Sequence, residues 1–282
     1  MCVSDNCGPD EGRRIFVAGS IGLAAAAAAP AIAQGPAPSA IANPPTRVLD
    51  DARVIHGPVT FTHNGQPTIG GYLARPRAEG VYPGVVVIAG NRISEEYIPN
   101  TCAALALAGF VGLAPDIFHV LPASAQTLDQ MRAASAKHTD NDVLEDIGAG
   151  LDYLRVQPFV RKDGFGALGF CYGGRIAMIL GARSREVDAV VAYHPGKTSA
   201  AEVARLRAPV QIHIGTADSN VPLSDIRELE RVLKAQGTPT EVNLYEGADH
   251  GFLAYTRPPR YKPDAAVLSW QRTTAFLQRT LK

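Results

Sequence analysis

A cysteine at the start of a predicted helix lies in a setting that would make it a nucleophile. Residues 169–173 read Gly-Phe-Cys-Tyr-Gly, between a strand-length apolar run at 165–170 and a helical pattern at 173–183. The segment matches the G-x-S-x-G elbow with Cys171 in place of serine, and its glycines are needed because side chains would clash with the sharply turned backbone. The backbone N–H of Tyr172 could donate to an oxyanion, and the helix N-terminus lowers the pKa of the thiol.

A nucleophile of this kind requires an acid and then a histidine later in the chain. Asp218 follows the apolar run 210–214 in IHIGTADSNVP, and His250 follows the alternating run 241–245 in YEGADHGF. Because the carboxyl ends of parallel strands meet at one edge of a sheet, we expect these side chains to lie near Cys171. His250 would take the thiol proton, and Asp218 would orient the imidazole and stabilise its protonated form.

Other residues that could do chemistry have simpler interpretations. His213 lies inside a predicted strand and is expected to be structural, whereas His194 follows another strand near the pocket rim. Asp249 is adjacent to His250 and cannot easily reach across its ring. Cys102 lies in an apolar helical run, where a buried thiol behaves as a small hydrophobe. No two His, Cys or carboxylate residues fall at a recognised ligand spacing, so we predict no metal site.

Strands and helices that alternate along the chain must position these residues. Strand-length apolar or alternating runs occur at 84–89, 110–114, 165–170, 189–193, 210–214 and 241–245. Helical patterns occur at roughly 97–108, 141–156, 173–183, 222–236 and 264–281, and Asp140 is expected to cap the second of them. Residues 58–75 predict a hairpin around Asn64-Gly65. The alternation predicts one doubly wound α/β domain, with a mostly parallel sheet and helices on both faces.

The composition excludes several classes of protein. The 282 residues include 27 Lys plus Arg and 27 Asp plus Glu, and 46% are hydrophobic, which is not the composition of a disordered chain. Since there is no basic excess, we predict no nucleic-acid partner. Four cysteines at this length do not indicate a disulfide scaffold.

The amino terminus resembles an export signal. Arg13 and Arg14 precede an uncharged apolar stretch at 15–33 that ends in Ala-Ile-Ala, as in a twin-arginine signal peptide. We predict a signal peptide over 1–33, recognised by the twin-arginine (Tat) export machinery, and a periplasmic or secreted mature protein without stable membrane association. A signal retained as a membrane anchor is the alternative. Residues 34–50 would form a flexible lead-in, and 51–282 the folded domain.

Four segments together resemble one enzyme family. GFCYGG, TADSNVP, GADHGF and AGFVGLAPDIF are similar to segments of the dienelactone hydrolases, and the likeness extends from about residue 58 to residue 280. A cysteine in the elbow is typical of that branch of the α/β hydrolases. The resemblance implies the α/β-hydrolase fold and hydrolysis of cyclic esters, such as a carboxymethylenebutenolide, without a cofactor. It also implies that Cys171 is the nucleophile, Asp218 the acid and His250 the base.

One position departs from the family. The resemblance implies a glutamate after the strand at 84–89, and the aligned residue here is Gly90. We expect His250 to be the only strong partner of the resting thiol, and we expect a glutamate introduced at Gly90 to be accommodated at a loop edge. Asn91 would supply the second oxyanion N–H. Arg92 and Arg257 are candidates for binding a substrate carboxylate.

The sequence thus predicts an exported hydrolase that cleaves small esters or lactones through an acyl-enzyme on Cys171. A thioesterase or a broad carboxylesterase is the alternative within the enzymes. A catalytically silent binding protein with the same fold is the alternative of another class, and the glutamate missing at Gly90 is its only support.

Overall fold

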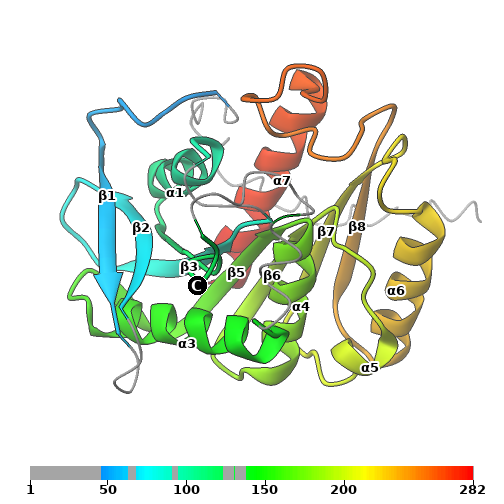
Figure 1. Cartoon of the computed structure of the whole chain (residues 1–282), viewed down its shortest axis with the longest axis horizontal. Coiled ribbons are helices and arrows are strands. Elements are labelled where there is room, and N and C mark those ends of the chain that lie inside the picture. The colour runs from blue at the N-terminus through cyan, green and yellow to red at the C-terminus, as the bar shows by residue number, and fades with distance from the viewer. Residues whose placement is uncertain (1–45, 63–67, 91–94, 123–129, 131–137, 282) are drawn as a thin grey trace, which may run out of the picture. The chain divides into compact units, whose positions relative to one another are not determined.

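A single sheet contains every strand of the described residues. The computed structural model describes residues 46–62, 68–90, 95–122, 130 and 138–281. Its strands are β1 (Val54–Phe61), β2 (Ile69–Pro76), β3 (Tyr82–Ile88), β4 (Val111–Pro115), β5 (Val160–Phe170), β6 (Val187–Tyr193), β7 (Val210–Gly215) and β8 (Thr240–Tyr245). They lie in the order β1-β2-β4-β3-β5-β6-β7-β8 (Figure 1). The pairs β1–β2 and β2–β4 are antiparallel and all others are parallel, which confirms the predicted mostly parallel sheet.

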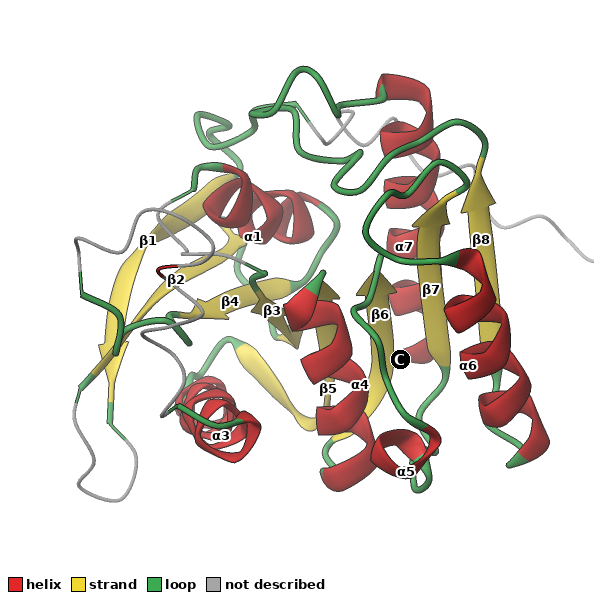
Figure 2. Ribbon diagram, turned by 45° about the vertical axis from the view of Figure 1, so that its right-hand side comes forward, coloured by secondary structure: helices red, strands yellow, loops and turns green. Residues whose placement is uncertain are grey.

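Helices cover both faces of this sheet (Figure 2). They are α1 (Tyr97–Leu107), α3 (Asp140–Val156), α4 (Tyr172–Arg183), α5 (Ala200–Val203), α6 (Leu223–Ala235) and α7 (Pro263–Thr280). Buried side chains of α1 and α7 join one apolar cluster, and those of α3, α4 and α6 join a second cluster on the opposite face. The doubly wound α/β arrangement predicted from the sequence is therefore confirmed.

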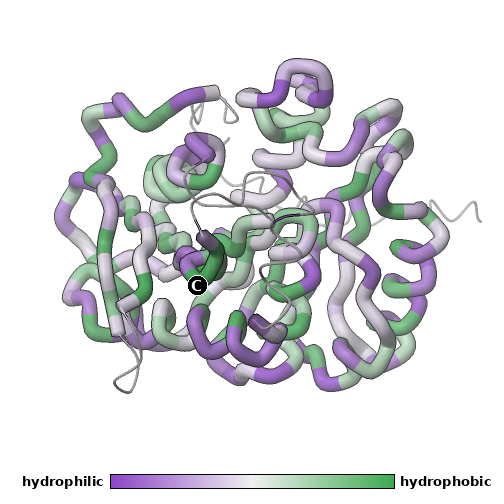
Figure 3. The backbone as a smooth tube through the Cα atoms, in the orientation of Figure 1, coloured by the Kyte–Doolittle hydropathy of each residue, from purple (hydrophilic) through white to green (hydrophobic). Residues whose placement is uncertain are grey.

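Continuous apolar strands explain why the sheet is covered on both faces. Val85, Val86, Val87 and Ile88 of β3 are all fully buried, although successive side chains of a strand point to opposite faces. The edge strand β1 is instead buried only at its two ends, and it alternates between half-buried and exposed positions in between. Hydrophobic segments accordingly gather in the central strands, and hydrophilic ones in the outer helices and connections (Figure 3).

The start of α3 differs from the sequence expectation. Thr139, not Asp140, is the N-cap, because its hydroxyl accepts the N–H of Asp142 while the Asp142 carboxylate accepts the N–H of Thr139. Asp140 is the first helical residue, and its carboxylate accepts the Tyr172 hydroxyl at 2.9 Å and pairs with Arg175 at 2.7 Å. Two reciprocal hydrogen bonds between Thr139 and Asp142 cap the helix, so the Asp140 carboxylate is free of that role and contacts α4, the helix that follows the elbow.

Two further expectations concern the amino-terminal part. The antiparallel pairing of β1 and β2 agrees with the predicted hairpin, whose Asn64-Gly65 turn lies outside the described residues. The predicted signal peptide also lies outside them. Where the predicted lead-in is described, it packs against α1: the N–H of Val48 donates to Asn100 Oδ1 at 2.6 Å, and Asn100 Nδ2 donates to Thr46 O at 2.9 Å. Among the described helices, none has the length and apolar character to cross a membrane.

Candidate active site

Cys171 lies at the sharp turn between β5 and α4. Its φ of 54° is in the left-handed region, which a side chain other than glycine rarely adopts. The surrounding backbone holds this conformation. The Cys171 N–H donates to Tyr193 O at 3.0 Å, and the Cys171 carbonyl accepts the N–H of Gly196 at 3.1 Å. Both contacts tie the elbow to the end of β6, so the thiol is presented at the carboxyl edge of the sheet.

The glycines on either side of the elbow are required by close backbone approach. A Cβ at Gly169 would lie 2.0 Å from the carbonyl oxygen of Gly173, and a Cβ at Gly173 would lie 2.1 Å from the carbonyl oxygen of Ile88. No side chain fits at either distance. The steric reason given for the motif from the sequence is therefore the one that the structure shows.

Asp218 and His250 meet on neighbouring loops after β7 and β8. His250 Nδ1 lies 3.0 Å from Asp218 Oδ2 and 3.1 Å from Oδ1, and Oδ1 also accepts the backbone N–H groups of Asn220 and Val221. The Asp218 side chain is only 1% exposed. With Nδ1 engaged in this way, Nε2 is the nitrogen of His250 that remains for the thiol.

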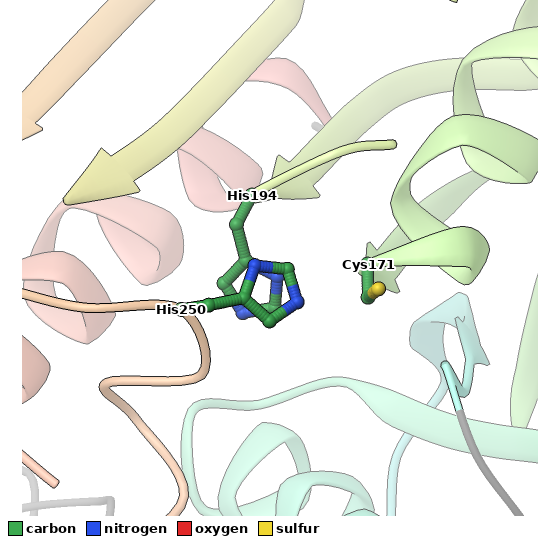
Figure 4. A group of neighbouring side chains, drawn as sticks. All are labelled: Cys171, His194 and His250. Atoms are coloured by element: carbon green, nitrogen blue, oxygen red, sulfur yellow. The ribbon is translucent and has the colours of Figure 1, made fainter. Parts of the chain in front are cut away.

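The thiol lies next to the imidazole. Cys171 Sγ and one ring nitrogen each of His250 and His194 all lie within 4.8 Å of one another, at the meeting point of α4, β6 and the loop after β8 (Figure 4). The structure therefore brings together the three residues predicted as nucleophile, base and acid, although 79 positions of the sequence separate Cys171 from His250.

The pKa values of the three groups shift in the directions that an ion pair requires. Burial alone would raise the pKa of the Cys171 thiol, but the His250 imidazole and the Tyr172 backbone N–H lower it below the ordinary value. Burial alone would lower the pKa of His250, but hydrogen bonds to Asp218 and Cys171 raise it to about 9. The pKa of Asp218 is lowered by the same imidazole despite its burial. The arrangement favours a thiolate beside an imidazolium in the resting protein.

His194 is closer to this centre than the sequence indicated. It is only 4% exposed, has a φ of 35°, and its ring centroid lies 4.2 Å from that of His250. Burial and the neighbouring His250 lower its pKa to about 3, so it stays neutral beside the imidazolium. Its Nδ1 has no hydrogen-bond partner among the described residues. The sequence signal for His194 was its position directly after a buried strand.

Asp249 joins the loops that carry Asp218 and His250. Its Oδ1 accepts the His250 N–H at 2.6 Å and the Ser219 N–H at 3.1 Å, so one carboxylate links the residue after Asp218 to His250. The sequence interpretation that Asp249 does not orient the His250 ring agrees with this geometry. His213 is fully buried and bonded to Tyr245, as expected for a structural residue.

A cavity of about 920 Å³ opens onto the thiol. Cys171, His194, His250 and Arg257 are among the residues that line it. The guanidinium of Arg257 lies 2.6 and 2.7 Å from the two carboxylate oxygens of Glu95, so its charge is already paired. Glu95 carries no motif that would have indicated this pairing from the sequence. The predicted Asn91 and Arg92 lie outside the described residues.

Gly90 faces the elbow, but it leaves no room for a side chain. A Cβ there would lie 2.7 Å from the Phe170 carbonyl oxygen and 3.0 Å from Cys171 Cβ. The expectation that a glutamate would be accommodated at Gly90 is therefore wrong. The position is not a loop edge, because it packs directly against the backbone that presents the thiol.

The doubly wound sheet with a nucleophile elbow at its carboxyl edge defines an α/β hydrolase. Comparison with known proteins narrows this class. The family model "Dienelactone hydrolase family" matches residues 69–281, and the chain belongs to that family.

Individual relatives agree with the assignment. The chain is 28% identical to a Synechocystis protein named "Putative carboxymethylenebutenolidase", covering 76% of this chain and 93% of the relative. It is 31% identical to a Bradyrhizobium protein named "Probable 2-oxo-3-(5-oxofuran-2-ylidene)propanoate lactonase", covering 76% and 90%. Among solved structures, a "Putative Dienelactone Hydrolase" from Klebsiella pneumoniae superposes with a TM-score of 0.74 at 25% identity, covering 80% of this chain and 98% of that one.

Proposed function

We propose that this protein hydrolyses small esters or lactones through a Cys171–His250–Asp218 triad and an acyl-enzyme. The observation that carries the proposal is the convergence of the three side chains on one cavity, with the Cys171 and His250 pKa values shifted towards the ion pair. Family membership supports hydrolysis of this kind.

The first half-reaction follows from the positions of the groups. The Cys171 thiolate attacks the carbonyl carbon, and the π electron pair moves to the carbonyl oxygen. The Tyr172 N–H, which already interacts with the sulfur, stabilises that oxyanion; we assign the second donor to the N–H of Asn91. As the tetrahedral intermediate collapses, the C–O bond of the ester breaks, and the leaving oxygen takes the proton from His250.

The second half-reaction regenerates the thiolate. His250, now neutral, removes a proton from a water molecule as that water attacks the thioester carbon. Collapse of this second intermediate breaks the C–S bond, releases the carboxylic acid and restores the thiolate beside the imidazolium. Asp218 holds the imidazole in the required orientation throughout, because its carboxylate contacts Nδ1 and lies buried.

The substrate class rests on the relatives and the cavity. Two relatives carry names of lactone-opening enzymes, which favours a cyclic ester. A cavity of about 920 Å³ has room for a small ring with polar substituents. Because Arg257 is paired with Glu95, we assign recognition of a substrate carboxylate to Arg92 rather than to Arg257 alone.

We also propose that the protein is exported by the twin-arginine pathway and acts in the periplasm. The paired Arg13 and Arg14 and the apolar stretch at 15–33 support this proposal. Sequencing the amino terminus of the protein recovered from the periplasm is the test. We expect a first residue near Gln34, and an intact Met1 would contradict cleavage.

The catalytic proposal is tested with a panel of small esters, thioesters and lactones. We expect Cys171→Ala to abolish hydrolysis, and Cys102→Ala, the matched control at a fully buried thiol, to leave it unchanged. With a slowly deacylated ester, mass spectrometry should detect one acyl group on Cys171. Undiminished hydrolysis in Cys171→Ala would refute the triad. Binding without turnover across the panel would instead favour the silent binding protein, and thioester preference would favour a thioesterase.

A further inference from the structure

Two histidines and an aspartate converge outside the triad. His119 Nε2 lies 3.1 Å and His138 Nε2 lies 3.0 Å from the same oxygen, Asp146 Oδ2. The three donor atoms lie within 4.8 Å of one another, and the two imidazole rings are nearly perpendicular, at 86°. None of the three residues belongs to the Cys171 cluster.

The fold supplies the three residues from separate elements. His119 lies in the turn after β4, His138 directly precedes the α3 N-cap Thr139, and Asp146 lies within α3. The Asp146 and His138 side chains are 12% and 13% exposed. The carboxylate is therefore held by a helix, and the Asp146 and His138 donors are largely shielded from solvent, as in sites that bind a cation.

The chemistry of this set is that of a transition-metal site. Imidazole nitrogens and a carboxylate oxygen are ligands that Zn²⁺ prefers, and three protein ligands leave a fourth position for water or another donor. A buried carboxylate is costly unless it is paired or coordinates a metal. Among the described residues, the charged or chargeable partners bonded to the Asp146 carboxylate are these two imidazoles.

The distances fit a bound ion. Zinc lies about 2.0–2.1 Å from nitrogen and oxygen ligands, so tetrahedral geometry places two such ligand atoms about 3.3–3.4 Å apart. The observed separations of 3.0 and 3.1 Å lie only a few tenths of an ångström below this. Small rotations of the side chains would therefore open the space that an ion needs.

We propose that His119, His138 and Asp146 form a binding site for a divalent transition metal of the Zn²⁺ class. The ion would join two points of the chain that lie 19 positions apart, and it would fasten both to α3. A metal cross-link of this kind stabilises the folded protein, because the ion binds the folded chain and finds no preformed site in the unfolded chain. His138 also lines the cavity that contains Cys171, so the site borders the proposed substrate pocket.

A second cluster must be distinguished from this one. Cys171, His194 and His250 also offer three donors within 4.8 Å of one another. A Co²⁺ probe separates the two sites, since a cobalt–thiolate bond produces a charge-transfer band that a His₂Asp site lacks. The test therefore compares protein that retains Cys171 with Cys171→Ala protein: a thiolate band seen only when Cys171 is present reports the second cluster, and binding that persists in Cys171→Ala protein is independent of the proposed hydrolysis.

The experiment titrates the full-length protein, with and without Cys171, with Co²⁺ and with Zn²⁺, and every variant carries Cys2→Ser and Cys7→Ser so that the amino-terminal thiols do not bind the metal. In Cys171→Ala protein we expect one equivalent of Co²⁺ with tetrahedral d–d bands and no thiolate band. At a Zn²⁺ concentration about 100 times the Kd, the Tm should rise by about 5–10 °C, and EDTA should reverse the change. Absence of saturable binding would overturn the proposal.

Ligand variants in the Cys171→Ala background locate the site. Asp146→Asn and His119→Gln should each weaken Zn²⁺ binding by at least about 10–100-fold, and His56→Gln is the matched control. His56 is also a hydrogen-bonded histidine, but it contacts Tyr72 on β2 and not the cluster. If Asp146→Asn does not fold, His119→Gln decides, because its side chain is the most exposed of the three at 23%. Unchanged affinity in these variants would mean that the three residues form only a hydrogen-bonded cluster.

Discussion

Substitution of Gly90 by alanine tests how tightly the segment after β3 packs against the nucleophile elbow. The added Cβ would lie 2.7 Å from the Phe170 carbonyl oxygen and 3.0 Å from Cys171 Cβ, whereas ordinary contacts begin at 3.4 Å. Relief of the shorter contact requires a shift of about 0.7 Å in one of the two segments. The Phe170 carbonyl belongs to the last residue of β5, so the shift would be transmitted to the thiol.

The magnitude has two parts. Overpacking of a well-packed region costs about 1–3 kcal/mol, so the free energy of unfolding should fall by that amount. A displacement approaching 1 Å at a reacting group costs up to about 100-fold in rate, so we expect kcat of the folded Gly90→Ala protein to fall by about 10–100-fold. Gly90→Glu carries the same Cβ contact with a larger side chain, and it should be at least as destabilised.

The assay measures ester hydrolysis and urea-induced unfolding on the same preparations. Gly70→Ala, in β2, is the matched control because a Cβ there meets nothing within 4 Å. The control should keep wild-type kcat and change the unfolding free energy by less than about 1 kcal/mol. Wild-type activity and stability in Gly90→Ala would refute the reasoning, since the elbow would then have room that the structure does not show.

Four further predictions concern the titratable groups around the thiol. Alkylation of Cys171, followed by mass spectrometry of its own peptide so that Cys2 and Cys7 do not contribute, should reach half its maximal rate below about pH 8.5, the ordinary cysteine pKa, because His250 lowers the thiol pKa. Cys102 should not react in the same experiment, since it is fully buried, and a midpoint for Cys171 at or above that pH would contradict the ion pair. Asp218→Asn should lower kcat by about 10⁴-fold, measured at saturating ester, and activity near wild type would exclude Asp218 as the orienting acid. The loss of unfolding free energy in Asp218→Asn should be largest between about pH 4 and pH 6.5 and should shrink as the pH rises through about 9. The reason is that the raised pKa of His250 stabilises the folded protein only while the imidazole is protonated. Urea-induced unfolding across this pH range measures the loss. His194→Asn should lower kcat by about tenfold with little change in KM, because the His250 ring loses the surface packed against it, and an unchanged kcat would show that this contact does not position the base.

The alternation of elements and the sharp turn that carries Cys171 were predictable from local sequence. Few backbone conformations are compatible with an apolar run of strand length that is followed by a Gly-x-Cys-x-Gly turn and a helical pattern. At Gly169 and Gly173 the close approach of the backbone excludes every side chain. The positions of Asp218 and His250 followed from topology, since residues after parallel strands share one sheet edge. The elements and the turn needed only periodicity and sterics within short segments, whereas the placement of Asp218 and His250 also needed the parallel arrangement of the strands.

Two predictions made from local sequence were wrong. Asp140 is an acceptable cap, but Thr139 with Asp142 forms a reciprocal pair and displaces it. Gly90 follows a strand and reads as the start of an open loop, yet it lies against the backbone of Phe170 in β5. The capping pair lies within residues 139–142, whereas the contact of Gly90 depends on a strand whose position no single segment specifies.

Tertiary structure alone decided which distant side chains meet. The contact of His194 with His250 depends on how the ends of β6 and β8 are placed, and the cluster of His119, His138 and Asp146 depends on packing of α3 beside the turn after β4. The spacing of these residues in the sequence matches no ligand motif. Local periodicity determines which elements form, whereas distances of 3 to 5 Å between side chains on different elements are set by the packing of the whole core.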